Sequence, residues 1–115
     1  MLRIDALTVD ALDPDALAAF WSELLGGTVR RDDDGDVWVE FGNGSPDLLF
    51  GASTDARVVK NRLHLDLRPD DQGAEVARAL ALGARHVDIG QTGDESWIVL
   101  ADPEGNEFCI LRALP

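Results

Sequence analysis

Few residues in this 115-residue chain combine reactive side chains with a spacing that would bring them together. His64, one of two histidines, is followed two positions later by Asp66. Leu63, Leu65 and Leu67 alternate with them, which is the pattern of a half-buried strand. Since residues two apart point to the same face of a strand, His64 and Asp66 should share its polar face. An imidazole in such a position can hydrogen-bond a ligand, exchange protons or bind a metal ion, or it can simply pair with a carboxylate.

A second pair with the same spacing lies in a predicted strand over residues 107–111. Glu107 and Cys109 share one face of that strand. Asp66 and Glu107 could contact a cationic ligand or act as a general base, and the alternative is a solvated or arginine-paired carboxylate. Cys109 is the only cysteine, which excludes an internal disulfide. Its alternative to a ligand contact is a small, buried, apolar side chain.

Two tryptophans are further candidates for ligand contact. Trp38 and Trp97 are predicted to occupy matching positions on strands over residues 37–41 and 97–100. As a pair they could form aromatic walls around a flat or apolar ligand, and the alternative is packing in the core.

Two helices must hold these strands in place. Asp13 followed by Pro14 is typical of a helix start, and apolar residues at positions 17, 20, 21 and 24 form one helical face. Gly26 and Gly27 predict the end of this helix. A second helix should start after Asp70 and Asp71 and end at Gly83. Further strands are predicted over residues 3–10, 28–31, 47–51 and 86–89. The aspartate-rich stretch 32–36 and residues 90–95 are predicted turns.

The order of elements repeats. Each half reads strand, helix, strand, strand, strand, and Leu7 and Asp13 recur as Leu65 and Asp71, 58 residues later. The sequence therefore predicts one α+β domain, residues 1–115, made of two tandem βαβββ modules. Module one covers about residues 1–52, a crossover residues 53–59, and module two residues 60–115. Their curved mixed sheets should enclose one cleft, with the helices outside and His64 facing the cleft.

Paired modules, the stretch 60–67 and the segment 97–109, which reads WIVLADPEGNEFC, resemble the glyoxalase/bleomycin-resistance/dioxygenase superfamily. This superfamily is also called vicinal oxygen chelate, and the compact glyoxalase-like domain group is the nearest. The resemblance implies metal-ligand positions on the first and last strand of each module, which here are Ala6, Phe50, His64 and Cys109. Two of these side chains cannot coordinate a metal, whereas a catalytic metal generally needs three protein ligands.

The resemblance therefore favours a small-molecule-binding protein without a catalytic metal or other cofactor. Its ligand would be apolar, aromatic or cationic, as in the bleomycin-resistance branch. The expected contacts are Phe50, His64, Asp66, Trp38, Trp97 and Cys109. The alternative is a metal-dependent lyase, isomerase or dioxygenase in which His64 and Glu107 are ligands or acid–base residues. The resemblance also implies a homodimer.

The charge of the chain limits its partners. A net charge of −12 argues against binding to nucleic acid or an anionic membrane surface, and it favours a cationic small molecule or simply a soluble surface. We find no signal-peptide pattern and no apolar run long enough to span a bilayer, which predicts a cytoplasmic protein.

Overall fold

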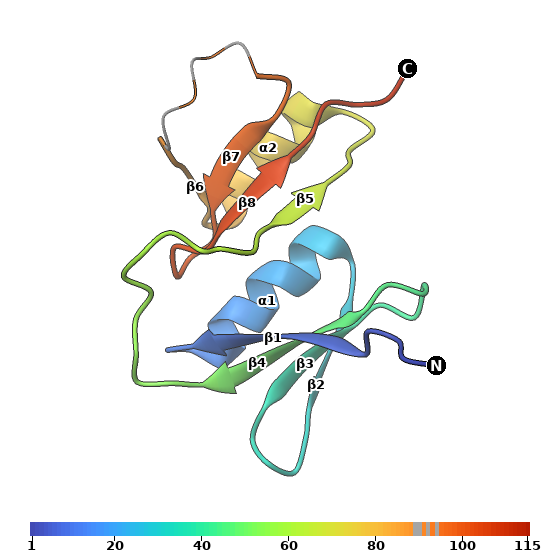
Figure 1. Ribbon diagram of the computed structural model, residues 1–115, viewed down its shortest axis with the longest axis vertical. Coiled ribbons are helices and arrows are strands. Elements are labelled where there is room, and N and C mark those ends of the chain that lie inside the picture. Colours follow the sequence, from blue (N-terminus) through green and yellow to red (C-terminus); the bar gives the residue numbers. More distant parts are fainter. Residues whose placement is uncertain (89–90, 92, 94) are drawn as a thin grey trace. The chain divides into compact units, whose positions relative to one another are not determined.

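The computed structural model describes residues 1–88, 91, 93 and 95–115, and the chain divides into two compact units, residues 1–56 and 57–115 (Figure 1). Unit one contains β1 (Ala6–Ala11), α1 (Pro14–Leu25), β2 (Thr28–Arg31), β3 (Val37–Glu40) and β4 (Asp47–Ala52). Unit two contains β5 (Leu65–Leu67), α2 (Gln72–Leu82), β6 (Arg85–His86), β7 (Ile98–Ala101) and β8 (Glu107–Ile110).

Both units have the same mixed sheet. The strand order is β1-β4-β3-β2 in unit one and β5-β8-β7-β6 in unit two. In each unit the first strand is parallel to the last, and the other neighbours are antiparallel. The predicted α+β class and the two βαβββ modules are confirmed. The cleft between the modules stays a prediction.

The helix boundaries follow from their capping residues. The side chain of Asp13 accepts a hydrogen bond from the Ala16 amide at 3.1 Å, and Asp71 accepts one from the Ala74 amide at the same distance. Gly26, with φ +80°, and Gly83, with φ +119°, follow the two helices in the left-handed conformation that glycine adopts without steric cost. Both predicted helices are therefore confirmed at both ends.

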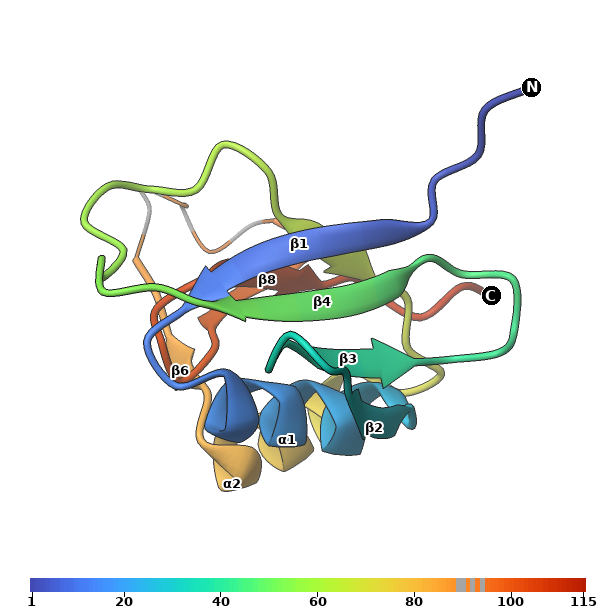
Figure 2. The same ribbon diagram turned by 90° about the horizontal axis from the view of Figure 1, so that it is seen from below.

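In unit one, α1 covers one face of the sheet (Figure 2). Its buried side chains are Leu17, Ala18, Phe20, Trp21 and Leu24, and those of the sheet are Ala11, Val37, Val39, Leu48 and Phe50. Strand alternation then directs Trp38 and Leu49 to the opposite face, where both side chains are only half-buried. Unit one thus has one packed face and one open face.

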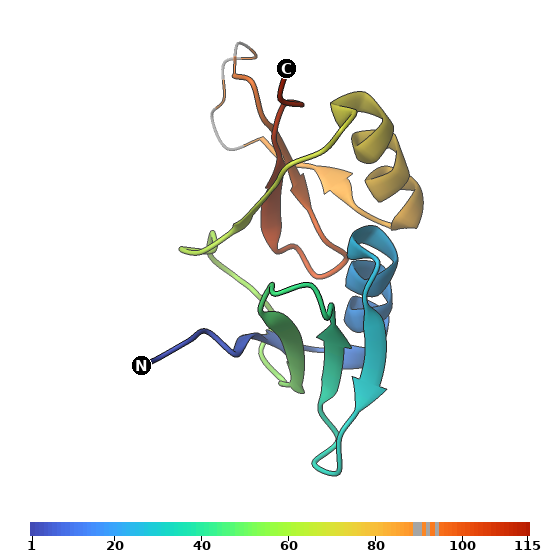
Figure 3. The ribbon, with the colours of Figure 1, turned by 90° about the vertical axis from the view of Figure 1, so that its right-hand side faces the viewer.

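Unit two is built in the same way, and Figure 3 shows α2 on one side of the strands. Phe108, Ile110 and Leu100 are buried on the helix side of the sheet. The other face of the sheet carries Asp66, Cys109 and Val99, which lie opposite one another across three neighbouring strands. This face lies away from α2 and is called the open face below, although Val99, Glu107 and Cys109 on it are buried and Asp66 is its exposed member. It positions the polar residues singled out in the sequence.

Several predicted strand boundaries are wrong. The predicted strand at residues 60–67 is reduced to β5, and His64 lies directly before it. Leu63, expected on the apolar face, is 85% exposed, because the chain bends at residues 62 and 63. The first strand begins at Ala6 instead of residue 3. Of the strand and turn predicted over residues 86–95, Ile89, Gly90, Thr92 and Asp94 lie outside the described residues.

Candidate functional site

His64, Asp66 and Cys109 form a cluster on the open face of unit two. β5 and β8 run parallel in a register that sets Asp66 opposite Cys109. His64 Nδ1 lies 3.1 Å from Asp66 Oδ1, and one ligand atom from each of the three residues lies within 4.8 Å of the other two. The side chains of His64 and Asp66 are 38% and 52% exposed, whereas Cys109 is buried. The cluster is therefore open to solvent on its imidazole and carboxylate side.

The environment of Cys109 keeps its thiol protonated. Burial raises the pKa of the thiol above its ordinary value of 9.0, and the negative charge and hydrogen bond of Asp66 raise it further. The positive charge of Lys60 acts in the opposite direction, more weakly. At neutral pH Cys109 is therefore a weak hydrogen-bond donor rather than a nucleophile.

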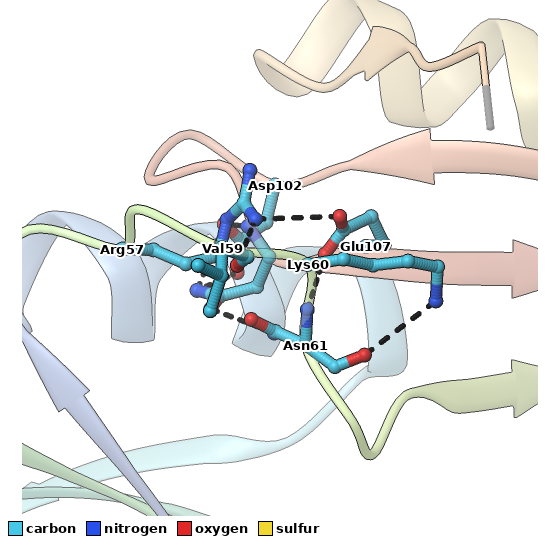
Figure 4. Close-up of polar contacts among 7 residues, drawn as sticks. Arg57, Val59, Lys60, Asn61, Asp102 and Glu107 are labelled. Carbon is cyan, nitrogen blue, oxygen red and sulfur yellow. Dashed lines mark hydrogen bonds and ion pairs between the residues drawn. The ribbon is translucent and has the colours of Figure 1, made fainter.

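Glu107 shares the face of Cys109 but is not part of this cluster. Its side chain is 7% exposed, and its Oε1 lies 3.4 Å from Arg57 Nη1. The Asn61 amide donates to Oε2 at 3.4 Å (Figure 4). Both partners come from residues 57–64, which precede β5 and are called the lead-in segment below. Glu107 is therefore paired with an arginine, and its contact with a ligand stays a prediction.

The hairpin loop before β8 is held by a buried carboxylate. Asp102 Oδ1 accepts hydrogen bonds from the amides of Glu104 and Asn106 at 3.0 and 2.9 Å, and the Asn106 side-chain amide also donates to Asp102. Asn106 Oδ1 in turn accepts a hydrogen bond from Asn61 Nδ2 at 3.0 Å. These contacts connect the lead-in segment to the loop and to the start of β8 (Figure 4).

The prediction that Phe50 lies on the ligand-binding face is wrong. Phe50 is fully buried on the face covered by α1, opposite Val37 and Val9. The loop before β4, residues 41–46, is one residue longer than the loop before β8, residues 102–106, so the last strands of the two units do not align at equal distance from these loops. A slip of one residue moves a side chain to the other face of a strand.

The strand register gives the correct equivalence between the units. Thr8 lies opposite Leu49 in unit one as Asp66 lies opposite Cys109 in unit two, so Leu49 is the counterpart of Cys109. Ala6 lies opposite Asp47, which is then the counterpart of Glu107. Asp47 was missed by sequence reasoning, and its carboxylate accepts a hydrogen bond from the Phe41 amide at 3.3 Å. The clustered side chains that could coordinate a metal thus belong to unit two, where Asp66 joins His64 and Cys109.

The two tryptophans do not occupy matching positions. Trp38 lies opposite Leu49, and the residue opposite Cys109 on β7 is Val99. Trp97 precedes β7 and is 42% exposed. The predicted match of Trp38 with Trp97 is therefore wrong, because the strand register makes Val99, two residues after Trp97, the counterpart of Trp38.

Trp38 makes polar contacts within unit one. Its indole Nε1 donates a hydrogen bond to Asp32 Oδ2 at 2.9 Å, and the Arg30 guanidinium lies 5.1 Å from the ring centroid. The same indole hydrogen bond lowers the pKa of Asp32, with smaller contributions from the amides of Asp36 and Asp34 and from Arg30; slight burial opposes them. Trp38 therefore anchors the aspartate-rich turn at residues 32–36.

The His64 cluster has the donor types of a metal site. An imidazole nitrogen, a carboxylate oxygen and a thiolate sulfur suit a borderline ion such as Zn²⁺, and three protein ligands would leave a coordination position open. Among the residues that the structure describes, these three are the group within bonding reach of a single ion. The donor types fit, provided that Cys109 loses its proton and that the ligand atoms, now within 4.8 Å of one another, approach to the spacing that zinc bonds of about 2.0–2.3 Å require.

Comparison with known families gives one match over most of the chain. A family model described as a glyoxalase-like domain matches residues 6–111, which confirms the predicted resemblance. Comparison with curated proteins finds no significant match. Within the described residues, neither helix is long and apolar enough to cross a bilayer.

Solved structures with the same fold include both enzymes and a binding protein. A glyoxalase/bleomycin resistance protein/dioxygenase family enzyme from Burkholderia phytofirmans is 21% identical, with a TM-score of 0.75 over 98% of this chain and 100% of that one. The trypanothione-dependent glyoxalase I of Leishmania major is 19% identical, with a TM-score of 0.70 over 97% and 87%. An antibiotic-binding protein from Streptomyces is 18% identical, with a TM-score of 0.66 over 99% and 98%.

Proposed function

The chain belongs to the glyoxalase-like domain family, and from that premise we propose that it binds a small molecule on the open face of unit two. The observation that carries the proposal is the cluster of His64, Asp66 and Cys109 on that face. Two of the three side chains are accessible to a ligand, and the third is protected from solvent.

The chemistry of His64 follows from its contact with Asp66. Nδ1 lies 3.1 Å from the carboxylate, so a proton on Nδ1 of the neutral imidazole would face Asp66 and leave Nε2 as an acceptor. A ligand hydroxyl or amine could donate to Nε2, and proton exchange with the ligand would pass through the same atom. His64 is therefore the residue on which binding should depend most strongly.

The remaining surface of this face suggests the class of ligand. Asp66 supplies exposed negative charge, and Glu107 supplies a nearly buried carboxylate that pairs with Arg57. Cys109 and Val99 are apolar neighbours on the same face, and both are buried. An apolar or aromatic molecule with a cationic group would match both. The similarity in fold to an antibiotic-binding protein is consistent with this class.

The second candidate function is a metal-dependent lyase, isomerase or dioxygenase. The proximity of the three donor atoms favours it. His64, Asp66 and Cys109 would hold the ion, and Glu107, which pairs with Arg57, would not be a ligand. A bound divalent ion would supply Lewis-acid activation of a substrate oxygen or water.

Two measurements distinguish these functions. Under the binding-protein proposal, elemental analysis of protein purified without chelator gives well below one metal ion per chain, and a thermal-shift screen of cationic aromatic compounds finds ligands. A ligand at 100 times its Kd adds about 2.7 kcal/mol to the free energy of unfolding. A stoichiometric metal that disappears in His64→Ala would instead establish the second candidate. We also propose that the protein is a homodimer, as the resemblance implies, and light scattering measures its mass in solution.

A further inference from the structure

Glu107 is a nearly buried carboxylate whose ionic partner comes from a segment without regular secondary structure. Residues 57–64 form neither helix nor strand, and Val58, Val59 and Leu63 in this segment are more than half exposed. Arg57 therefore reaches Glu107 from a lead-in segment with little packing of its own. A segment of this kind opens at a lower cost than a packed strand.

The contacts of Glu107 are long for charge-assisted hydrogen bonds. The Arg57 guanidinium and the Asn61 amide both lie 3.4 Å from carboxylate oxygens, whereas such bonds are commonly about 2.7–2.9 Å long. The guanidinium also donates to the Val59 carbonyl of its own segment and lies against the turn at Gly105. Arg57 thus neutralises Glu107 without the bidentate geometry that would hold it tightly.

The position of Glu107 connects it to the proposed ligand site. Glu107 and Cys109 lie on the same face of β8, and two residues of a strand span about 7 Å. Lys60, which also belongs to the lead-in segment, is close enough to lower the pKa of Cys109. Two cationic side chains of this segment are therefore near the proposed site: Arg57 contacts Glu107 and Lys60 acts on Cys109.

We propose that Glu107 is the anchor for a guanidinium, amidinium or ammonium group of the ligand, and that Arg57 occupies this anchor until the ligand displaces it. This inference rests on the proposed function, because it names the cationic end of the molecule whose other end contacts His64. In the ligand-free protein, Arg57 acts as a tethered competitor, which gives it a high effective concentration at Glu107.

Binding of methylguanidinium tests the anchor directly, with sodium chloride at equal ionic strength as the salt control. We expect Arg57→Ala to bind methylguanidinium at least about tenfold more tightly than the wild type, because the tethered competitor is gone. Saturable stabilisation in a thermal-shift titration is the readout. The double variant Arg57→Ala/Glu107→Gln should lose this response. Equal responses in the single and double variants, or none in either, would overturn the proposal.

Trypsin cleavage provides a second test that does not require Arg57→Ala to fold. Trypsin must accept the Arg57 side chain to cut after it, so its contact with Glu107 should protect this bond relative to the bond after Arg62, which is exposed. Methylguanidinium should raise the ratio of cleavage after Arg57 to cleavage after Arg62 in the wild type. In Glu107→Gln this ratio should already be high when no methylguanidinium is added. A ratio that neither change alters contradicts displacement of Arg57.

The two proposals can fail separately. If screened ligands bind and depend on His64 while both methylguanidinium tests are negative, only the cationic anchor is wrong. If the tests succeed but no larger ligand binds in a His64-dependent manner, Glu107 is a cation site and the proposed function is wrong.

Discussion

Removing the carboxylate of Asp102 should destabilise unit two strongly. This side chain is 1% exposed and accepts hydrogen bonds from the Glu104 amide, from the main-chain amide of Asn106 and, on both of its oxygens, from the Asn106 side-chain amide. A hydrogen bond to a charged group contributes about 1.5–3 kcal/mol, but donors that regain water after the substitution recover part of this. We therefore expect Asp102→Ala to lower the free energy of unfolding by about 3 kcal/mol, well below the sum of the lost hydrogen bonds.

Asp32 offers a matched control, because it makes the same turn in the hairpin between β2 and β3. Asp32 accepts from the Asp34 and Asp36 amides at 2.9 and 3.0 Å, as Asp102 does from residues 104 and 106. Asp32 is much less buried, so water replaces its contacts more easily. Urea unfolding followed by circular dichroism should give a clearly smaller loss for Asp32→Ala than for Asp102→Ala. Equal losses would refute the reasoning that burial of Asp102 sets the magnitude.

Three further predictions test the electrostatics and the register. The Trp38 hydrogen bond lowers the pKa of Asp32 below 3.8, so its stabilising contribution is present above pH 3.8 and is lost as the pH falls through the folded-state value. Asp32→Asn should thus be less stable than the wild type at neutral pH and approach it in acid, and a constant difference would disprove this. Burial and Asp66 raise the pKa of Cys109, so its contribution to stability is present below pH 9.0 and is lost as the pH rises through the folded-state pKa. Iodoacetamide should therefore alkylate the native thiol more slowly than free cysteine at pH 8, and Asp66→Asn should speed this alkylation. Phe50→Ala should cost about 3–5 kcal/mol in urea unfolding, and a loss near zero would contradict its position in the core.

The helices and turns were predictable because short-range chemistry determines them. Asp13 and Asp71 cap their helices through a side-chain contact three residues away, and Gly26 and Gly83 adopt positive φ. No long-range contact is required for either signal. The sequence pattern alone therefore predicted where both helices begin and end, and together with the predicted strands it gave the βαβββ order.

The site was predicted less well because it depends on register between distant strands. The pairing of Asp66 with Cys109 confirmed that these side chains share one face, since β5 and β8 both alternate regularly. Phe50 was misassigned because loop length shifts the register by one residue, which composition does not reveal. The pairing of Arg57 with Glu107 spans most of the sequence of unit two and has no sequence signal beyond opposite charge.

Both hairpin turns share a motif that sequence comparison could have found. Residues 32–36 read DDDGD and residues 102–106 read DPEGN, and both have aspartate first and glycine fourth. Gly35 and Gly105 have φ of +85° and +90°, which explains the need for glycine at this position. The motif lies in the β2–β3 hairpin of unit one but in the β7–β8 hairpin of unit two. A simple overlay of the two halves therefore hides it.

The most direct test of the central claim is an NMR titration that follows the two histidine imidazoles. His64 lies in the proposed site, and His86 is an exposed residue on β6 that serves as the internal control. We predict that a cationic aromatic compound that raises the melting temperature shifts the His64 signals saturably and leaves those of His86 unchanged. Saturable binding of such a compound with no change at His64 would contradict the claim that the open face of unit two is the ligand site.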